Sequence, residues 1–169
     1  MSRLWVVRHA EAVPDESALS EVGRRQAALL GERLAGEPIT RISHSPLPRA
    51  AETASIVARR LPGVPVQAAS ELADADPDAD PAGAAAMVAR FARPAADEVV
   101  VTHNFQVAWF VRDALSAPAD RWIGLNQCNA GVTVLGYRDG RPPSLLVFND
   151  VSHLPAELRW TGFPAELRL

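Results

Sequence analysis

Four side chains that could do chemistry together follow apolar segments or begin a helix in this chain. Arg8 and His9 follow a four-residue apolar run near the first residue, and His103 comes one residue after a run of three valines. Arg49 falls in the first turn of a helix that Pro48 is suited to begin. Ligands of open α/β sheets bind at the carboxyl ends of the strands. We therefore expect these four side chains to meet at one edge of a sheet.

The hypothesis that these residues suggest is nucleophilic attack by His9 on a phosphoryl group. An arginine in the first turn of a helix lies beside backbone amides that favour anions. Taken singly, each site also has a structural explanation: a polar strand end, an arginine paired with Glu52, or a histidine with satisfied hydrogen bonds. Three such sites in one small α/β chain make coincidence a poor explanation.

Strands and helices alternate in the predicted elements that position these residues. Strands are expected over 4–7, 39–42, 64–67, 98–102, 131–137 and 144–148, and helices over 21–35, 48–61, 81–93 and 105–115. Ser20 is the predicted N-cap of the first helix, and Asp139-Gly140 is the predicted turn of a hairpin. This alternation is typical of an α/β fold.

Composition restricts the class of protein. The chain has 169 residues, 48% of them hydrophobic and 22% charged, which is typical of a single globular domain. Its net charge of -3 argues against nucleic-acid binding. Cys128 is the only cysteine, which excludes an intramolecular disulfide and a cysteine zinc cluster. Without a signal peptide or a segment of membrane-spanning length, we expect a soluble cytoplasmic protein with no membrane partner.

The C-terminal residues differ in character from the rest. We expect a domain over 1–154 and a tail over 155–169, which holds two copies of Pro-Ala-Glu-Leu-Arg, too few for a solenoid. A homodimer could form through an exposed edge strand or through this tail. Of the remaining histidines, His44 is expected in a loop near the mouth of the site, and His153 in a packing or supporting role.

Four motifs, in the right order, resemble those of the histidine phosphatase superfamily, also called phosphoglycerate mutase-like. They are Arg8-His9 after an N-terminal strand, Leu19-Ser20-x-x-Gly23-x-x-Gln26-Ala27, Ser45-Pro46-Leu47-x-Arg49-Ala50-x-x-Thr53-Ala54, and Thr102-His103. The resemblance covers about 3–154 and implies a single-domain three-layer α/β/α sandwich with a largely parallel sheet. One departure is Ala10, where the family usually has glycine, and we expect this small residue to be tolerated.

The resemblance implies a role for each of these residues. His9 would be the nucleophile that becomes phosphohistidine, Arg8 and Arg49 would bind the phosphoryl oxygens, and His103 and Asn104 would complete the phosphate pocket. The two arginines are expected to lower the pKa of His9 and so keep its imidazole neutral near pH 7. Because phosphoryl transfer mainly needs positioning and stabilisation of charge, which the guanidinium groups supply, we expect no metal ion and no other cofactor.

The general acid is where the chain departs most from the family. A Leu-x-Glu is expected there, but the chain has Leu72-Ala73-Asp74, so we predict that Asp74 donates the proton, with Asp76 and Glu71 as alternatives. An aspartate is one methylene shorter than a glutamate. Either its loop approaches the site more closely, or acid catalysis is weak and substrates with good leaving groups, such as phosphohistidine or aryl phosphates, are favoured.

The predicted activity is that of a hydrolase. Segments 60–64 and 76–81 resemble phosphoglycerate-mutase-like serine/threonine protein phosphatases, and the short length resembles small bacterial phosphohistidine phosphatases. Mutases typically carry longer insertions, so we predict a metal-independent phosphatase of the histidine acid phosphatase type. Its substrate would be a phosphorylated small molecule or a phosphoprotein. The alternatives are a mutase-like phosphotransferase and a phospho-ligand binding module without catalysis. A zinc hydrolase is disfavoured because the histidines lie far apart.

Overall fold

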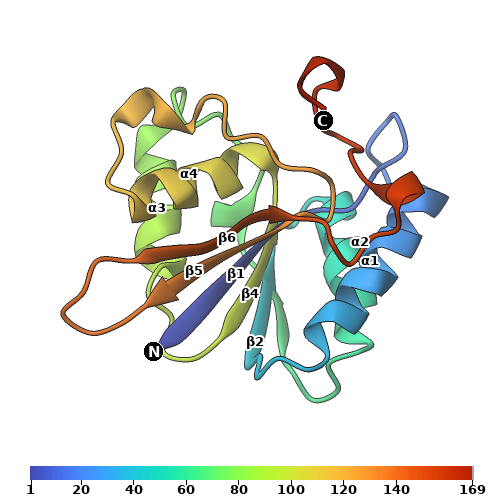
Figure 1. The fold of residues 1–169 in the computed structure, drawn as a ribbon, viewed down its shortest axis with the longest axis horizontal. Coiled ribbons are helices and arrows are strands. Elements are labelled where there is room, and N and C mark those ends of the chain that lie inside the picture. Colours follow the sequence, from blue (N-terminus) through green and yellow to red (C-terminus); the bar gives the residue numbers. More distant parts are fainter. Residues whose placement is uncertain (169) are drawn as a thin grey trace.

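A six-stranded sheet forms the centre of the computed structural model, which describes residues 1–168 (Figure 1). The strands are β1 (Ser2–Arg8), β2 (Arg41–His44), β3 (Val66–Ala68), β4 (Glu98–Thr102), β5 (Val132–Tyr137) and β6 (Ser144–Asp150). Their order is β3-β2-β4-β1-β5-β6. Strands β3, β2, β4 and β1 are mutually parallel, whereas β5 and β6 form an antiparallel hairpin beside β1. The largely parallel sheet predicted from the sequence is confirmed.

Two pairs of helices cover the two faces of this sheet. They are α1 (Glu21–Leu34), α2 (Pro48–Ala58), α3 (Pro81–Phe91) and α4 (Asn104–Ala114). Helices α1 and α2 lie on one face, and α3 and α4 on the other (Figure 1). The predicted three-layer α/β/α architecture is therefore correct.

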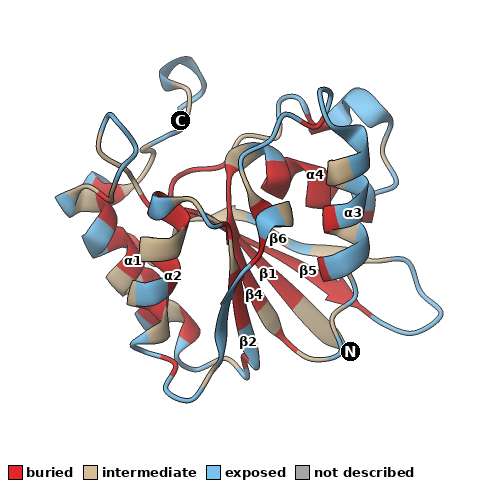
Figure 2. Cartoon of the chain, turned by 180° about the vertical axis from the view of Figure 1, so that it is seen from behind, coloured by how far each residue is buried: buried red, intermediate tan, exposed pale blue. Residues whose placement is uncertain are grey.

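Strand β1 is buried on both of its faces. Leu4 and Val6 point into the core beneath α3 and α4, whereas Trp5 and Val7 point into the core beneath α1 and α2. A strand covered on both sides reads as a continuous apolar run, as this one does. Figure 2 shows the central strands as a buried layer between the helices. Arg8 is the last residue of β1, so it lies where this buried strand leaves the core.

Two of the site residues, Arg49 and His103, lie at the starts of helices. Ser20 caps α1 as predicted, because its hydroxyl accepts a hydrogen bond from the amide of Gly23 at 2.9 Å. Helix α2 begins at Pro48, which places Arg49 in its first turn. His103 is the N-cap residue of α4, directly after β4. Each of these residues thus lies where an element meets the carboxyl edge of the sheet.

The second strand lies two residues later than predicted. It spans Arg41–His44, because its parallel pairing with β4 begins where Arg41 faces Glu98. Ile39 is buried in the preceding loop, so the apolar residues there indicate burial and not strand pairing. The prediction for His44 was wrong as well. It ends a strand and bonds through Nδ1 to the carbonyl of Ser45, and it does not line the site described below.

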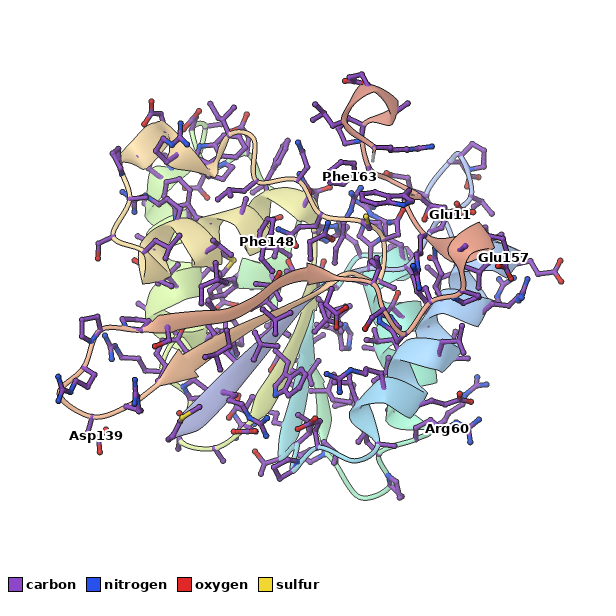
Figure 3. The ribbon with its side chains drawn as sticks, viewed as in Figure 1. Glu11, Arg60, Asp139, Phe148, Glu157 and Phe163 are labelled. Atoms are coloured by element: carbon purple, nitrogen blue, oxygen red, sulfur yellow. The ribbon has the colours of Figure 1, made fainter. Side chains whose placement is uncertain are left out.

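The tail is packed against the domain near α1. The side-chain amide of Gln26 donates to the carbonyl of Leu158 at 2.9 Å and to the hydroxyl of Thr161 at 2.8 Å. Both copies of the repeat form short 3-10 helices, η3 (Ala156–Leu158) and η4 (Ala165–Leu167). The leucine of the first copy is buried and that of the second, Leu167, is exposed. In Figure 3, Phe163 lies on this tail near the carboxyl ends of the strands.

Candidate active site

A pocket of about 260 Å³ opens at the carboxyl ends of β1, β2 and β4. It is lined by Arg8, His9, Glu16, Arg49, Asp74, His103, Asn104, Phe105, Asn126, Gly162 and Pro164. All six residues that the sequence selected as site residues are in this set. The other five come from the loop after β1, from α4 and the segment that follows it, and from the tail.

The imidazole of His9 is oriented so that its Nε2 faces Arg49 in the pocket. Its Nδ1 lies 2.8 Å from the carbonyl oxygen of Ala10, to which it donates, so the lone pair is on Nε2. The Nε–H of Arg49 donates to that Nε2 at 3.1 Å. The backbone amide of His9 bonds to the carbonyl of Thr102 at 2.8 Å, which ties the residue to β4. A nucleophilic nitrogen is thereby oriented toward a guanidinium group.

Burial keeps His9 neutral. It lowers the pKa of the imidazole to about 3, and His103, Arg8 and Arg49 act in the same direction more weakly. The carbonyl of Ala10 acts in the opposite direction. The neutral form was expected from the sequence with the two arginines as the cause, and the larger cause is the removal of the ring from water.

Thr53 holds the end of β1 and the start of α2 together. Its hydroxyl accepts from the amide of Ala10 at 3.1 Å and donates to the carbonyl of Arg49 at 2.7 Å. Ala10 is fully buried and accommodated without a glycine. Because both hydrogen bonds are buried, they fix the separation of His9 and Arg49.

Arg49 is buried, and all three of its guanidinium nitrogens have partners. Nε donates to His9, Nη2 lies 2.7 Å from Oδ2 of Asp74, and Nη1 lies 2.9 Å from Oε2 of Glu16. A planar guanidinium matches the geometry of a phosphoryl group. Two carboxylates thus occupy the donors with which Arg49 could hold a substrate.

The hydrogen bonds of Ser45 fix the second histidine. Ser45 Oγ accepts from the amide of Leu47 at 3.2 Å and lies 2.8 Å from His103 Nε2, so its hydrogen is available to that nitrogen. Nδ1 of His103 then carries the proton, 3.6 Å from Oδ2 of Asp74. Burial, with Arg49 and Arg8 as weaker causes, lowers the pKa of His103 to about 3. The ring is neutral, and this contact is not an ion pair.

Arg8 is held by backbone carbonyls and not by carboxylates. Its Nη1 donates to the carbonyls of Gln127 at 2.6 Å and of Gly162 at 2.7 Å. A Cβ at Gly162 would lie 2.9 Å from both terminal nitrogens of Arg8, and the φ of Gly162 is +68°. The tail can approach Arg8 this closely because the residue there is glycine.

Of the three candidate acids, Asp74 is the one in the pocket. Glu71 pairs with Arg90 and lines a separate cavity of about 240 Å³. Asp76 accepts a hydrogen bond from the amide of Asp78 and lies outside the pocket. Asn104 lines the pocket, with its Oδ1 bonded to the amide of Gln127 at 2.8 Å.

Sequence reasoning missed Glu16, Phe105, Asn126, Gly162 and Pro164 as pocket residues. Glu16 is an exposed acid in a polar loop, and Phe105 was assigned to a helix as an ordinary apolar residue. Gly162 lies 154 residues from its partner Arg8, so no local pattern could indicate the contact. Ser45 could have been selected from the sequence as a residue that supports the site, because it begins the motif that contains Arg49.

The buried histidines predict a loss of stability in acid. The pKa values of His9 and His103 are lowered to about 3 and that of His153 to about 4, from an ordinary 6.5. Below pH 6.5 the unfolded chain therefore binds protons that the folded chain does not, and each histidine costs about 1.4 kcal/mol per pH unit. We expect the free energy of unfolding, measured in urea, to fall from pH 6.5 to pH 5. In His153→Leu the slope of the free energy of unfolding against pH should decrease by about one third, because one of the three histidines is gone. An unchanged slope would contradict the lowered pKa of His153.

Part of the chain matches a known family, and most of it matches several known proteins. The family model of the histidine phosphatase superfamily (branch 1) matches residues 4–79. The chain is 29% identical to "Serine/threonine-protein phosphatase Pgam5, mitochondrial" of Caenorhabditis briggsae over 188 residues, which cover 94% of this chain and 66% of that protein. It thus spans about two thirds of the length of the curated relatives it matches.

Solved structures show the same fold. Phosphoserine phosphatase of Entamoeba histolytica, in a complex with phosphoserine, superposes with a TM-score of 0.76 at 19% identity, covering 92% of this chain and 100% of that one. YhfR of Bacillus stearothermophilus superposes with a TM-score of 0.72 at 22% identity, covering 90% of this chain and 99% of that one.

The comparisons do not support the cytoplasmic location expected from the sequence, because the curated relatives are named as mitochondrial proteins. No helix within residues 1–168 is long and apolar enough to cross a membrane. Over residues 4–79 the chain is similar to the histidine phosphatase superfamily (branch 1), and its fold is that of these two solved structures.

Proposed function

We propose that the chain is a phosphatase that hydrolyses phosphomonoesters through a phosphohistidine on His9. The observation that carries this proposal is the orientation of His9: its Nδ1 is bonded to the carbonyl of Ala10, which leaves a lone pair on Nε2 next to Arg49. A neutral, oriented imidazole beside a guanidinium group is what attack on a bound phosphoryl group requires. In this proposal, residues 1–154 form the phosphatase domain and 155–169 a tail, of which Gly162 and Pro164 line the pocket.

In the first step, the bound phosphoryl group takes up the donors of Arg49, including the Nε–H that is bonded to Nε2 of His9. The freed lone pair of Nε2 attacks phosphorus, and the bond between phosphorus and the ester oxygen breaks. Arg8, Arg49 and the Nδ1–H of His103 stabilise the charge on the equatorial oxygens. The leaving alkoxide takes the proton of the Asp74 carboxyl group and departs as an alcohol. Asn104 contributes to the wall of the phosphate pocket.

In the second step, a water molecule attacks the phosphorus of phospho-His9. The carboxylate of Asp74 accepts a proton from this water, the P–N bond breaks, and its electron pair returns to Nε2. Inorganic phosphate and neutral His9 result, and Asp74 is again protonated for the next turnover. Positive charge comes from the two guanidinium groups, so no step needs a metal ion or a cofactor.

Hydrolysis is favoured over phosphoryl transfer to a second acidic metabolite. Apart from Arg8 and Arg49, no arginine or lysine among the described residues lines the pocket, so a second phosphate or carboxylate group would lack a cationic partner. The names of the curated relatives favour a phosphoprotein substrate, and the solved structures include a small-molecule phosphatase. Because His9 and His103 stay neutral well below pH 6.5, we propose that activity extends into the acidic range.

The test is hydrolysis of p-nitrophenyl phosphate from pH 5 to pH 8 with EDTA present, together with acid- and alkali-quench analysis of the enzyme. We expect turnover that survives chelation and a phosphoenzyme that is labile in acid and stable in alkali, as a phosphoramidate is. Tight binding of vanadate without any turnover would instead identify a phospho-ligand binding module. Loss of activity with EDTA would contradict the proposed use of the arginines.

Asp74→Asn is expected to slow hydrolysis according to the leaving group. A poor leaving group such as the serine alkoxide needs the proton, whereas p-nitrophenolate hardly does. We expect about 10²-fold or more loss in kcat with phosphoserine and a much smaller loss with p-nitrophenyl phosphate. Asp76→Asn is the matched control, because it removes the same charge from the same loop outside the pocket. Equal losses on both substrates would show that Asp74 acts only by holding Arg49.

A further inference from the structure

Glu16 lines the pocket but has no part in the proposed reaction. It lies in the loop between β1 and α1, and its Oε2 is 2.9 Å from Nη1 of Arg49. The arginine side chain is 6% exposed and that of Glu16 is 60% exposed. The backbone of Glu16 has a φ of +59°, which is uncommon for a residue other than glycine. The exposed carboxylate of Glu16 thus pairs with Nη1 of the buried Arg49 guanidinium at the centre of the site.

The charges of the pocket leave Glu16 without a partner once a substrate binds. Two arginines and two carboxylates, Glu16 and Asp74, line the pocket, and their charges balance. A phosphomonoester dianion needs the donors of Arg49, and Asp74 must carry a proton to act as the acid. Glu16 is then the remaining negative charge beside a phosphoryl group, which repels it unless a positive charge lies nearby.

We propose that Glu16 determines specificity, by selecting phosphomonoesters that carry a positively charged group close to the phosphoryl group. When such a substrate binds, its phosphate displaces Glu16 from Arg49, and the carboxylate then accepts hydrogen bonds from the ammonium or guanidinium group of the substrate. The high exposure of Glu16 lets it turn without losing packing. This inference rests on the proposed function, because it concerns the same pocket.

The test compares two small esters of similar size, phosphoethanolamine and propyl phosphate, in the wild type and in Glu16→Gln. We expect the wild type to prefer the cationic ester in kcat/KM by about fivefold, the size of one exposed ion pair, and Glu16→Gln to lose most of this preference. The KM for p-nitrophenyl phosphate should fall in Glu16→Gln, because a competing anion has been removed. Glu21→Gln, an exposed residue of α1, makes the same change in net charge outside the pocket and should alter neither quantity.

A pair of phosphoserine peptides separates the two sources of such a cation. If the positive charge belongs to a neighbouring arginine of a protein substrate, the wild type will prefer a peptide with arginine beside phosphoserine over one with alanine, and will do so more strongly than it distinguishes the small esters. If the charge belongs to a small amino-alcohol phosphate, the small pair will show the larger preference.

Equal preference in the wild type and in Glu16→Gln, on both pairs, would overturn the inference while leaving the phosphatase intact. If the wild type hydrolyses none of these compounds, the proposed function fails, and displacement of bound vanadate decides about Glu16. Phosphoethanolamine should then displace vanadate more readily than propyl phosphate does in the wild type only. Equal displacement would remove the role assigned to Glu16.

Discussion

Replacement of His9 by alanine is expected to lower kcat for p-nitrophenyl phosphate by about 10⁴-fold or more, which is the scale seen when a nucleophile is removed. Nε2 of His9 is the atom that forms the bond to phosphorus. His103 is not placed to take over, because its Nε2 is hydrogen-bonded to Oγ of Ser45 and its Nδ1 faces Asp74. The acid-labile phosphoenzyme should be absent from the variant. Rate measurements with acid-quench analysis of the same samples check both expectations.

His44→Ala is the matched control for this variant. His44 is a half-buried histidine at the end of β2, which β4 separates from β1. It is bonded to the next carbonyl as His9 is, but it lies outside the pocket. It should keep wild-type turnover. Vanadate binding by His9→Ala would show that the arginines are still in place. A rate close to that of the wild type in His9→Ala would exclude the phosphohistidine route.

The meeting of His9 and His103 could be predicted because each follows a buried strand. Parallel strands present their carboxyl ends at one edge of the sheet, so polar residues at those ends must gather there. The pairing of Arg8 with Thr102 shows that β1 and β4 are neighbours, which places the two rings with their centroids 5.1 Å apart. The sequence contained the strands and their ends, but not the order in which the strands pair.

Contacts made by loops and by the tail could not be predicted in this way. Glu16 reaches Arg49 through a loop without periodicity, and Gly162 reaches Arg8 from the other end of the chain. Neither residue belongs to an element whose spacing indicates a buried face. The cause of the neutral state of His9 was hidden for a similar reason, because burial depends on how the whole chain packs around the ring.

Arg49→Lys tests whether the site needs the shape of the guanidinium group or only its charge. Lysine keeps the positive charge but has a single nitrogen, whereas Arg49 donates to His9 through Nε and offers Nη1 and Nη2 to anions. A lysine cannot orient the nucleophile and bind two phosphoryl oxygens at once. We expect kcat/KM for p-nitrophenyl phosphate to fall by about 10² to 10³-fold, as for the loss of one preorganised donor.

Arg24→Lys is the control for this substitution, because Arg24 also pairs with a glutamate, Glu52, but on the exposed surface of α1. Its kcat/KM should remain that of the wild type. A loss confined to KM in Arg49→Lys would mean that Arg49 only binds the phosphate, whereas a loss in kcat would mean that it also aligns His9 for attack. We expect both to change, because one guanidinium group contacts the nucleophile and the anion site together. An Arg49→Lys enzyme within about threefold of the wild type would show that charge alone is sufficient.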